Sequence, residues 1–149
     1  MQNSVDCLVS NGGDFVVDET GDLTLATALE TVQQDILFRA LTAHLDYGPD
    51  PFIGANLGSY KRLQNTKRTG DYIKASMYEA LVRDGRFLRN QVAVDVVPVS
   101  LKEVAVFIFI RDAIDGTEDE VYERSGVPVV TVSVDVTTGT VTAIDGASY

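Results

Sequence analysis

The strongest constraint on the fold is an amphipathic helix that runs directly into a proline-rich turn. Within residues 27–57, apolar side chains recur at helical spacing, at positions 29, 32, 36, 40, 41 and 45. Polar residues take the other face, and there Asp35 and Arg39 stand four residues apart in the favourable acid-first order. Thr27 and Glu30 have the spacing of a capping box, in which each side chain satisfies the other residue's backbone N–H. The sequence therefore predicts a well-defined helix start.

The helix must stop where the turn DYGPDPFIG begins at position 46. This turn holds two prolines and two glycines, and the residue before each proline is pushed towards extended geometry. We therefore expect a fixed turn that carries two aromatic side chains, Tyr47 and Phe52. The single histidine, His44, lies just before it, near a helix C-terminus that favours a cation.

Length and composition predict one globular domain over residues 1–149. The chain has a mass of 16.2 kDa with 45% hydrophobic and 23% charged residues, enough for a real core. No apolar run approaches the roughly 18 residues that a membrane helix needs. The first residues lack a basic and then hydrophobic leader pattern, so no signal peptide is expected. One cysteine, Cys7, excludes an internal disulfide and fits a reducing compartment as a small strand residue.

The later elements are predicted from periodicity and turn chemistry. Ahead of the central helix, residues 15–17 and 23–25 should pair as a β-hairpin around an acidic glycine turn. After the proline turn we expect a short helix at 55–63, a basic linker at 66–70 and a second strong helix at 71–83. Gly85 should end that helix in a left-handed conformation.

The last third of the sequence has strand character. Residues 91–99 alternate in part, and Pro98 indicates an edge or an end. Residues 103–111 read as a strand covered on both faces. Residues 112–126 form an acidic loop, and residues 127–136 and 140–144 form a hairpin around TTG. The predicted fold is therefore α+β, with an N-terminal β-hairpin, two to three helices, and a mostly antiparallel sheet of about four strands.

Charge is unevenly distributed along the chain. The net charge is -10, but residues 61–89 hold eight basic and three acidic residues, so this segment is +5 and the remainder -15. Such a dipolar chain suits a component that docks on neighbours, although a solvated basic helix face would look the same. Nucleic acid is disfavoured because the overall charge repels phosphate. We expect the basic segment to bind an acidic neighbour through Lys61, Lys67 and a buried anchor, Arg86.

The sequence lacks recognisable catalytic, cofactor-binding and metal-binding patterns. It has no nucleophile elbow, Walker A motif or dinucleotide fingerprint, and one histidine with one cysteine makes a zinc site unexpected. The acidic loop lacks the spacing of a calcium-binding EF-hand. A glycosidase needs two carboxylates, and Glu30 is the best candidate acid, but it already has a capping role. We therefore expect no enzyme and no cofactor, with a peptidoglycan-acting glycosidase as the alternative.

The string I-L-x-R-x-x-T-x-x-x-D-Y-x-x-D-P-x-x-G-x-x-L, from Ile36 to Leu57, resembles the sheath-initiator family of contractile phage tails. These are lysozyme-like baseplate wedge proteins with a relative in type VI secretion baseplates. The resemblance covers about residues 21–110. After the second helix the family usually has a Glu-Pro-Arg turn. This chain has Asp84 and Arg86 at the outer positions but Gly85 in place of the proline.

The resemblance implies a structural role in the virion, in a tail baseplate assembled in the host cytoplasm. Such proteins join the wedge to the sheath and template the first sheath ring by exchanging β-strands, with six copies around the tail axis. The implied partners are tail sheath protein, baseplate wedge proteins, and tail tube or hub proteins, with no nucleic acid and no membrane. A type VI secretion baseplate subunit with the same mechanics is a further alternative.

Strand exchange requires an open sheet edge that a partner's extended arm can complete. The strands over residues 104–110 and 129–134 are apolar and carry no guarding lysines, so we expect one of them to provide that edge. The residues predicted to bind the partner strand are Val104, Val106, Ile108, Val130, Val132 and Val134.

Overall fold

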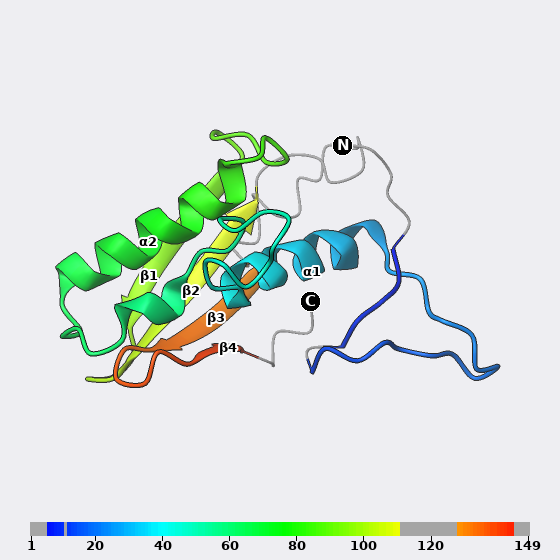
Figure 1. Ribbon diagram of the computed structural model, residues 1–149, viewed down its shortest axis with the longest axis horizontal. Coiled ribbons are helices and arrows are strands. Elements are labelled where there is room, and N and C mark those ends of the chain that lie inside the picture. The colour runs from blue at the N-terminus through cyan, green and yellow to red at the C-terminus, as the bar shows by residue number, and fades with distance from the viewer. Residues whose placement is uncertain (1–5, 11, 111–127, 145–149) are drawn as a thin grey trace.

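The computed structural model describes residues 6–10, 12–110 and 128–144, which contain two α-helices and a four-stranded antiparallel sheet. Figure 1 shows the chain order of the elements. In sequence these are α1 (Ala28–Leu41), the 3-10 helix η1 (Leu57–Tyr60), α2 (Lys67–Val82), β1 (Val92–Pro98), β2 (Glu103–Ile110), β3 (Val130–Asp135) and β4 (Val141–Ala143). The fold is therefore α+β, as the sequence predicts.

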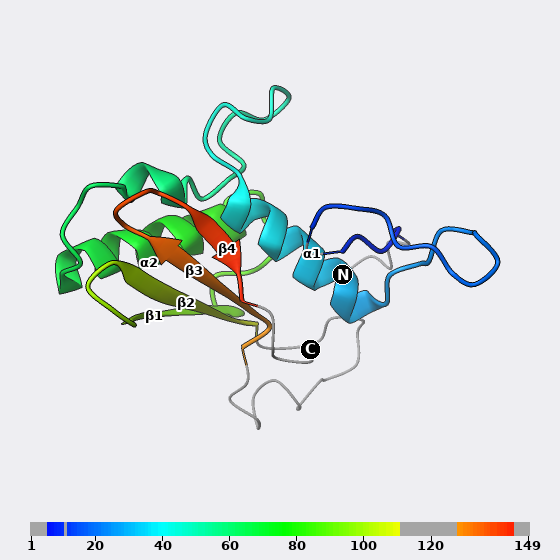
Figure 2. The ribbon, with the colours of Figure 1, turned by 90° about the horizontal axis from the view of Figure 1, so that it is seen from below.

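The sheet has the order β1-β2-β3-β4, and every neighbouring pair is antiparallel. Both helices cover the same face: α2 packs on β1 while α1 packs on β3 and β4 (Figure 2). The core fills the space between these two layers, and its largest fully buried side chains include Ile36, Ile73, Met77, Ile108 and Phe87. Two packed layers around one core are a common architecture for an antiparallel sheet that buries one face.

The start of α1 follows from its capping box. The backbone N–H of Glu30 donates to the Thr27 hydroxyl at 3.2 Å, and the N–H of Thr27 donates to the Glu30 carboxylate at 2.7 Å. This reciprocal pair satisfies two of the backbone donors that a helix N-terminus leaves free. The capping prediction is confirmed, and the helix ends at Leu41, ahead of the proline turn.

The second helix begins earlier than its hydrophobic stripe suggested. Residues 66–70, predicted to be a linker, instead supply the cap and the first turn of α2. The Thr66 side chain accepts a hydrogen bond from the N–H of Thr69, whose hydroxyl donates to the Gln64 carbonyl at 2.7 Å. Polar caps extend a helix beyond its apolar periodicity, which explains the error. At the other end Gly85 has φ 79°, the left-handed conformation expected there.

The two segments flanking α1 form less regular structure than predicted. Residues 6–10 and 12–26, the N-terminal arm, make three isolated antiparallel bridges, Cys7 with Leu25, Val9 with Phe15, and Val17 with Leu23. Within residues 55–63 the only helical structure is the four-residue η1.

The predicted strands 91–99, 103–111 and the 137–139 hairpin agree with β1 to β4 to within a few residues. The acidic loop 112–126 lies outside the described residues.

Candidate docking surface

The two helices are joined by a buried arginine. The Arg39 side chain is only 3% exposed, although helical spacing had placed it on the polar face. Its guanidinium donates to both Asp84 carboxylate oxygens, at 3.1 and 2.7 Å, to the Ala80 carbonyl at 2.9 Å and to Asp35 at 3.2 Å. A planar fork of donors suits this bidentate geometry, which lysine cannot reproduce. Arg39 therefore ties α1 to the end of α2.

The network continues through the turn after α2. Arg86 Nη1 lies 3.1 Å from Asp35 Oδ2, and the two groups form an ion pair. Their relative orientation does not allow a hydrogen bond to Asp35 Oδ2. The hydrogen bond from Arg39 holds the pKa of Asp84 below its ordinary value, against a smaller opposing effect of burial. Burial by itself would lower the pKa of Arg39, but Asp84 and Asp35 together raise it. Both outer residues of the Asp84-Gly85-Arg86 turn thus pair with α1.

The proline turn is held against the end of α1 by its own polar residues. The Asp46 carboxylate accepts from the N–H of Ala43 at 3.1 Å, and Asp50 pairs with Arg83 at 3.1 Å. Gly54 packs so closely on Thr42 that an added Cβ would lie 2.0 Å from the Thr42 carbonyl oxygen. Leu57, the last residue of the string that carries the family resemblance, is in the core. The residues of that string described here therefore hold the fold together.

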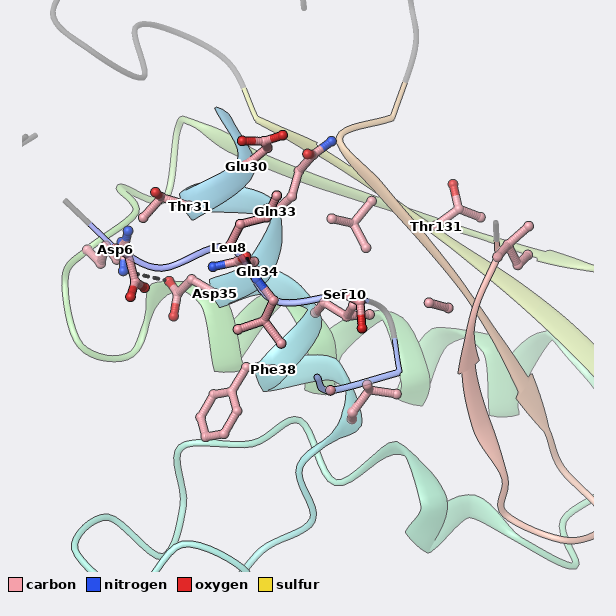
Figure 3. A pocket seen from close by; sticks show the side chains of 18 residues that line it. Asp6, Leu8, Ser10, Glu30, Thr31, Gln33, Gln34, Asp35, Phe38 and Thr131 are labelled. Atoms are coloured by element: carbon pink, nitrogen blue, oxygen red, sulfur yellow. Dashed lines mark hydrogen bonds and ion pairs between the residues drawn. The ribbon is translucent and has the colours of Figure 1, made fainter. Parts of the chain in front are cut away.

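A groove of about 680 Å³ lies between the N-terminal arm, α1 and the edge of the sheet. Figure 3 shows Leu8 and Ser10 from the arm, Gln34 and Phe38 from α1, and Thr131 from β3 around it. Gln34 fastens the arm to α1, because its amide donates to the Cys7 carbonyl at 3.2 Å and accepts from the N–H of Val9 at 2.6 Å. The arm thereby forms the wall opposite β4.

The groove is apolar along α1 and is bordered by an edge strand. Phe38 and Leu41 line it and are each 44% exposed, so α1 extends beyond the sheet with apolar side chains that no described strand covers. Ala143 and Ile144, at the end of β4, line the opposite side. Partly exposed apolar surface of this kind marks interaction sites more often than isolated exposed residues do.

The free backbone groups of β4 can be assigned from the register. The N–H groups of Asp135 and Ile144 donate to the carbonyls of Thr140 and Thr131, which fixes the hydrogen-bonded positions of the β3–β4 ladder. Antiparallel ladders alternate, so the N–H and C=O groups of Val141 and Ala143 point away from β3. Among the described strands β4 pairs only with β3. Its outer edge, beside the groove, can therefore accept another strand.

The six apolar residues predicted to bind a partner strand lie inside this protein's own core. Val104, Val106, Ile108, Val130, Val132 and Val134 are all buried, and the strands that hold them are the two interior strands of the sheet. β2 pairs with β1 and β3, and β3 pairs with β2 and β4. The open edge was therefore assigned to the wrong strands. Composition shows that a strand is buried, but only long-range pairing decides which strands lie at the edges.

The three basic residues predicted to dock on a partner have different surroundings. Lys61 and Lys67 are exposed, and neither forms an ion pair with another described residue. Arg86 is half-buried, with its side chain 30% exposed, and its charge is already paired with Asp35. Within this chain Arg86 therefore helps to hold α1, and its role as the anchor buried against an acidic partner stays a prediction.

The remaining candidate residues have structural partners. The Glu30 carboxylate caps α1 and lies at the rim of the groove. The His44 ring packs edge-on against Phe52, with ring centroids 5.4 Å apart, and Cys7 is a free thiol in the arm. Within the described ranges no three His, Cys, Asp or Glu residues cluster as a metal site, and no helix could cross a bilayer.

The chain was compared with protein families, with curated proteins and with solved structures. No protein-family model, curated protein or solved structure matches the chain.

Proposed function

We propose that this protein is a structural subunit of a contractile phage tail baseplate, which joins the wedge to the tail sheath and starts the first sheath ring. Its partner contributes an extended strand that pairs with the outer edge of β4 and lays alternate side chains into the groove. The observation that carries the proposal is the groove itself. The outer edge of β4, which no other described strand pairs with, lies beside apolar side chains of α1 that extend past the sheet.

An added strand would pair with the backbone edge of β4 and would also cover the apolar side chains of α1. The backbone groups of Val141 and Ala143 supply the ladder, while Phe38 and Leu41 supply an apolar cover on the helical side. Neighbouring strands lie about 4.8 Å apart, so a partner strand beside β4 places every second side chain under α1. A compact globular ligand would leave the edge donors of β4 unpaired.

The residues that carry the family resemblance pack against one another in this chain. Arg39 and Asp84, which belong to two separate parts of the resemblance, meet in one bidentate pair. Asp50 and Gly54 both fix the proline turn against neighbouring elements. The motif therefore describes one connected scaffold that holds α1, α2 and the turn in place.

The test is binding of tail sheath protein to purified variants, measured by pull-down and by sheath polymerisation. Ala143→Pro removes an N–H that points away from β3, so it should block strand addition without breaking the β3–β4 ladder. Ala143→Ser keeps this N–H and should bind as the wild type does. Phe38→Asp should also abolish binding, because it places a charge in the groove.

Leu88→Asp is the matched control for the groove variant. Leu88 is 57% exposed and does not line the groove, so its replacement should leave binding unchanged. Normal sheath assembly by Ala143→Pro would contradict strand addition at β4. Hydrolysis of peptidoglycan by the wild type, lost in Glu30→Gln with the fold intact, would instead support the glycosidase alternative. Binding to a type VI secretion sheath alone would favour the secretion-system alternative.

A further inference from the structure

The N-terminal arm carries an acidic and apolar surface away from the core. Phe15, Val17, Leu23 and Leu25 are between 50 and 64% exposed, which is unusual for four large apolar side chains in one short segment. Five carboxylates accompany them, those of Asp6, Asp14, Asp18, Glu19 and Asp22. The sequence has no lysine or arginine before Arg39, so nothing in the arm neutralises this charge.

A second surface has the opposite charge and a similar apolar content. We name it the basic pole, and it consists of Lys61, Arg62, Leu63, Lys67, Arg68, Val99, Leu101 and Lys102, all exposed. Asn65 joins its two segments, because its amide donates to the carbonyls of Ser100 and Glu103 at 2.6 and 3.2 Å. Leu101, at 92% exposed, is the most exposed large apolar side chain described.

The cations of the basic pole have little compensation within the protein. None of the five cations forms an ion pair with another described residue. Arg68 stacks on the Tyr72 ring, and the charge of Lys102 makes a small contribution to lowering the pKa of Asp135. By contrast, Arg39, Arg83, Arg86 and Arg89 all pair with carboxylates elsewhere in the protein. Among the described residues, the basic pole therefore holds the positive charge that is not paired within the protein.

The two surfaces lie at opposite ends of the long axis. In Figure 1 the tip of the arm is at the far right, while the start of α2 and the β1–β2 turn are at the far left, and Figure 2 agrees. We propose that the arm of one copy docks on the basic pole of the next copy. The interface is heterologous, so the copies associate head to tail and form a ring or an open chain.

A second copy of the chain provides partners for both the charged and the apolar residues of each surface. The carboxylates of the arm meet the cations of the pole, while Phe15, Val17, Leu23 and Leu25 cover Leu63, Val99 and Leu101. Nucleic acid would pair with the cations but would leave the apolar residues uncovered. The interface uses the part of the arm from residue 14 to residue 25, which does not line the groove, and it does not use β4. It therefore does not rest on the proposed baseplate role.

Paired charge reversals test this interface. The arm variant combines Glu19→Lys with Asp22→Lys and spares Asp18, whose carboxylate accepts the N–H groups of Thr20 and Asp22 in the turn. The pole variant combines Lys67→Glu with Arg68→Glu. These two positions open α2, where negative charge is compatible with the helix dipole. Sedimentation at about 20 mM and about 500 mM salt then measures association, because surface charges are strongly screened at the higher salt.

We expect the wild type to associate at low salt and to do so at least tenfold more weakly at high salt. Each variant alone should associate far more weakly than the wild type, because the two reversals remove most of the net charge of the arm or of the pole. An equimolar mixture of the two variants should associate again, since the unaltered arm of the pole variant then meets the unaltered pole of the arm variant. Leu101→Asp should also weaken association, without disturbing the core.

Arg83→Glu with Arg89→Glu is the control, because it gives the same net charge as the pole variant at sites outside the pole. A wild type that stays monomeric at low salt overturns the proposal, even if it binds a DNA duplex or heparin. A mixture that fails to associate overturns it as well. Equal loss of association in the control and the pole variant would show that only net charge matters, and would also overturn it.

Discussion

At the scale of the residue, Arg39 connects three parts of the chain through one guanidinium group. It contacts Asp35 on its own helix, the Ala80 carbonyl near the end of α2, and Asp84 in the following turn. The Phe87 ring lies 5.9 Å from the same guanidinium. A buried cation with all of these partners is tolerated, whereas the same cation without them would be strongly unfavourable.

We expect Arg39→Met to lower the free energy of unfolding by about 3 kcal/mol, because it removes the buried cation and the hydrogen bonds that Asp84 and the Ala80 carbonyl accept from it. Arg39→Lys should recover little of this loss, since lysine cannot bind a carboxylate bidentately. Arg89→Met is the control. It removes only the exposed pair with Glu79 and should cost much less than Arg39→Met. Urea denaturation measures all three, and equal losses would contradict the network.

The same pair predicts how stability depends on pH. The pKa of Asp84 is lower in the folded protein than its ordinary value of 3.8, chiefly because of the Arg39 hydrogen bond. Its contribution is therefore complete above the unfolded pKa and is lost as pH falls through the folded pKa. Asp84→Asn should be less stable than the wild type at pH 7, and this difference should shrink as pH falls below about 4. A difference that stays constant down to acid unfolding would contradict this.

At the scale of the element, the proline turn owes its position to a close backbone approach. Gly54 lies against Thr42, and the neighbouring N–H groups of Ala55 and Asn56 donate to the carbonyls of Arg39 and Thr42 at 2.8 and 3.2 Å. These bonds satisfy carbonyls at the end of α1 that would otherwise lack a helical partner. The turn therefore acts as the C-terminal cap of α1.

Gly54→Ala should lower the free energy of unfolding by about 2–3 kcal/mol, because the new methyl group must displace the Thr42 backbone. Gly48→Ala, in the same turn, should change it by less than about 1 kcal/mol, since no atom lies within 4 Å of its added Cβ. Thermal unfolding of both variants provides the comparison. Similar melting temperatures would show that the turn moves freely and does not cap α1.

At the scale of the whole molecule, both helices lie on one face of the sheet and both charged surfaces lie at the ends. This arrangement leaves the edge of β4 beside the groove and directs the arm away from the core (Figure 2). The two proposed interfaces are therefore separate. A subunit can add a partner strand along its side while it contacts neighbouring copies through its ends.

The local features of this fold could be predicted from the amino-acid sequence. The Thr27–Glu30 capping box, the stop before the proline turn, the left-handed Gly85 and the hairpin at 137–139 each depend on residues only a few positions apart. The α+β class followed from the change of periodicity along the chain. The charge asymmetry between residues 61–89 and the rest was also evident from the sequence.

The positions of the edge strands and the pairing of the charges depend on long-range contacts and could not be predicted in this way. The apolar runs of β2 and β3 indicated burial, but the order β1-β2-β3-β4 depends on pairing across many residues, and so does the free edge of β4. Arg39 lies on the polar side of its helix by sequence spacing and is buried because Asp84, 45 positions away, meets it. The groove likewise exists only because the arm folds back on α1 through Gln34. Each of these features is a long-range contact, for which local periodicity carries no signal.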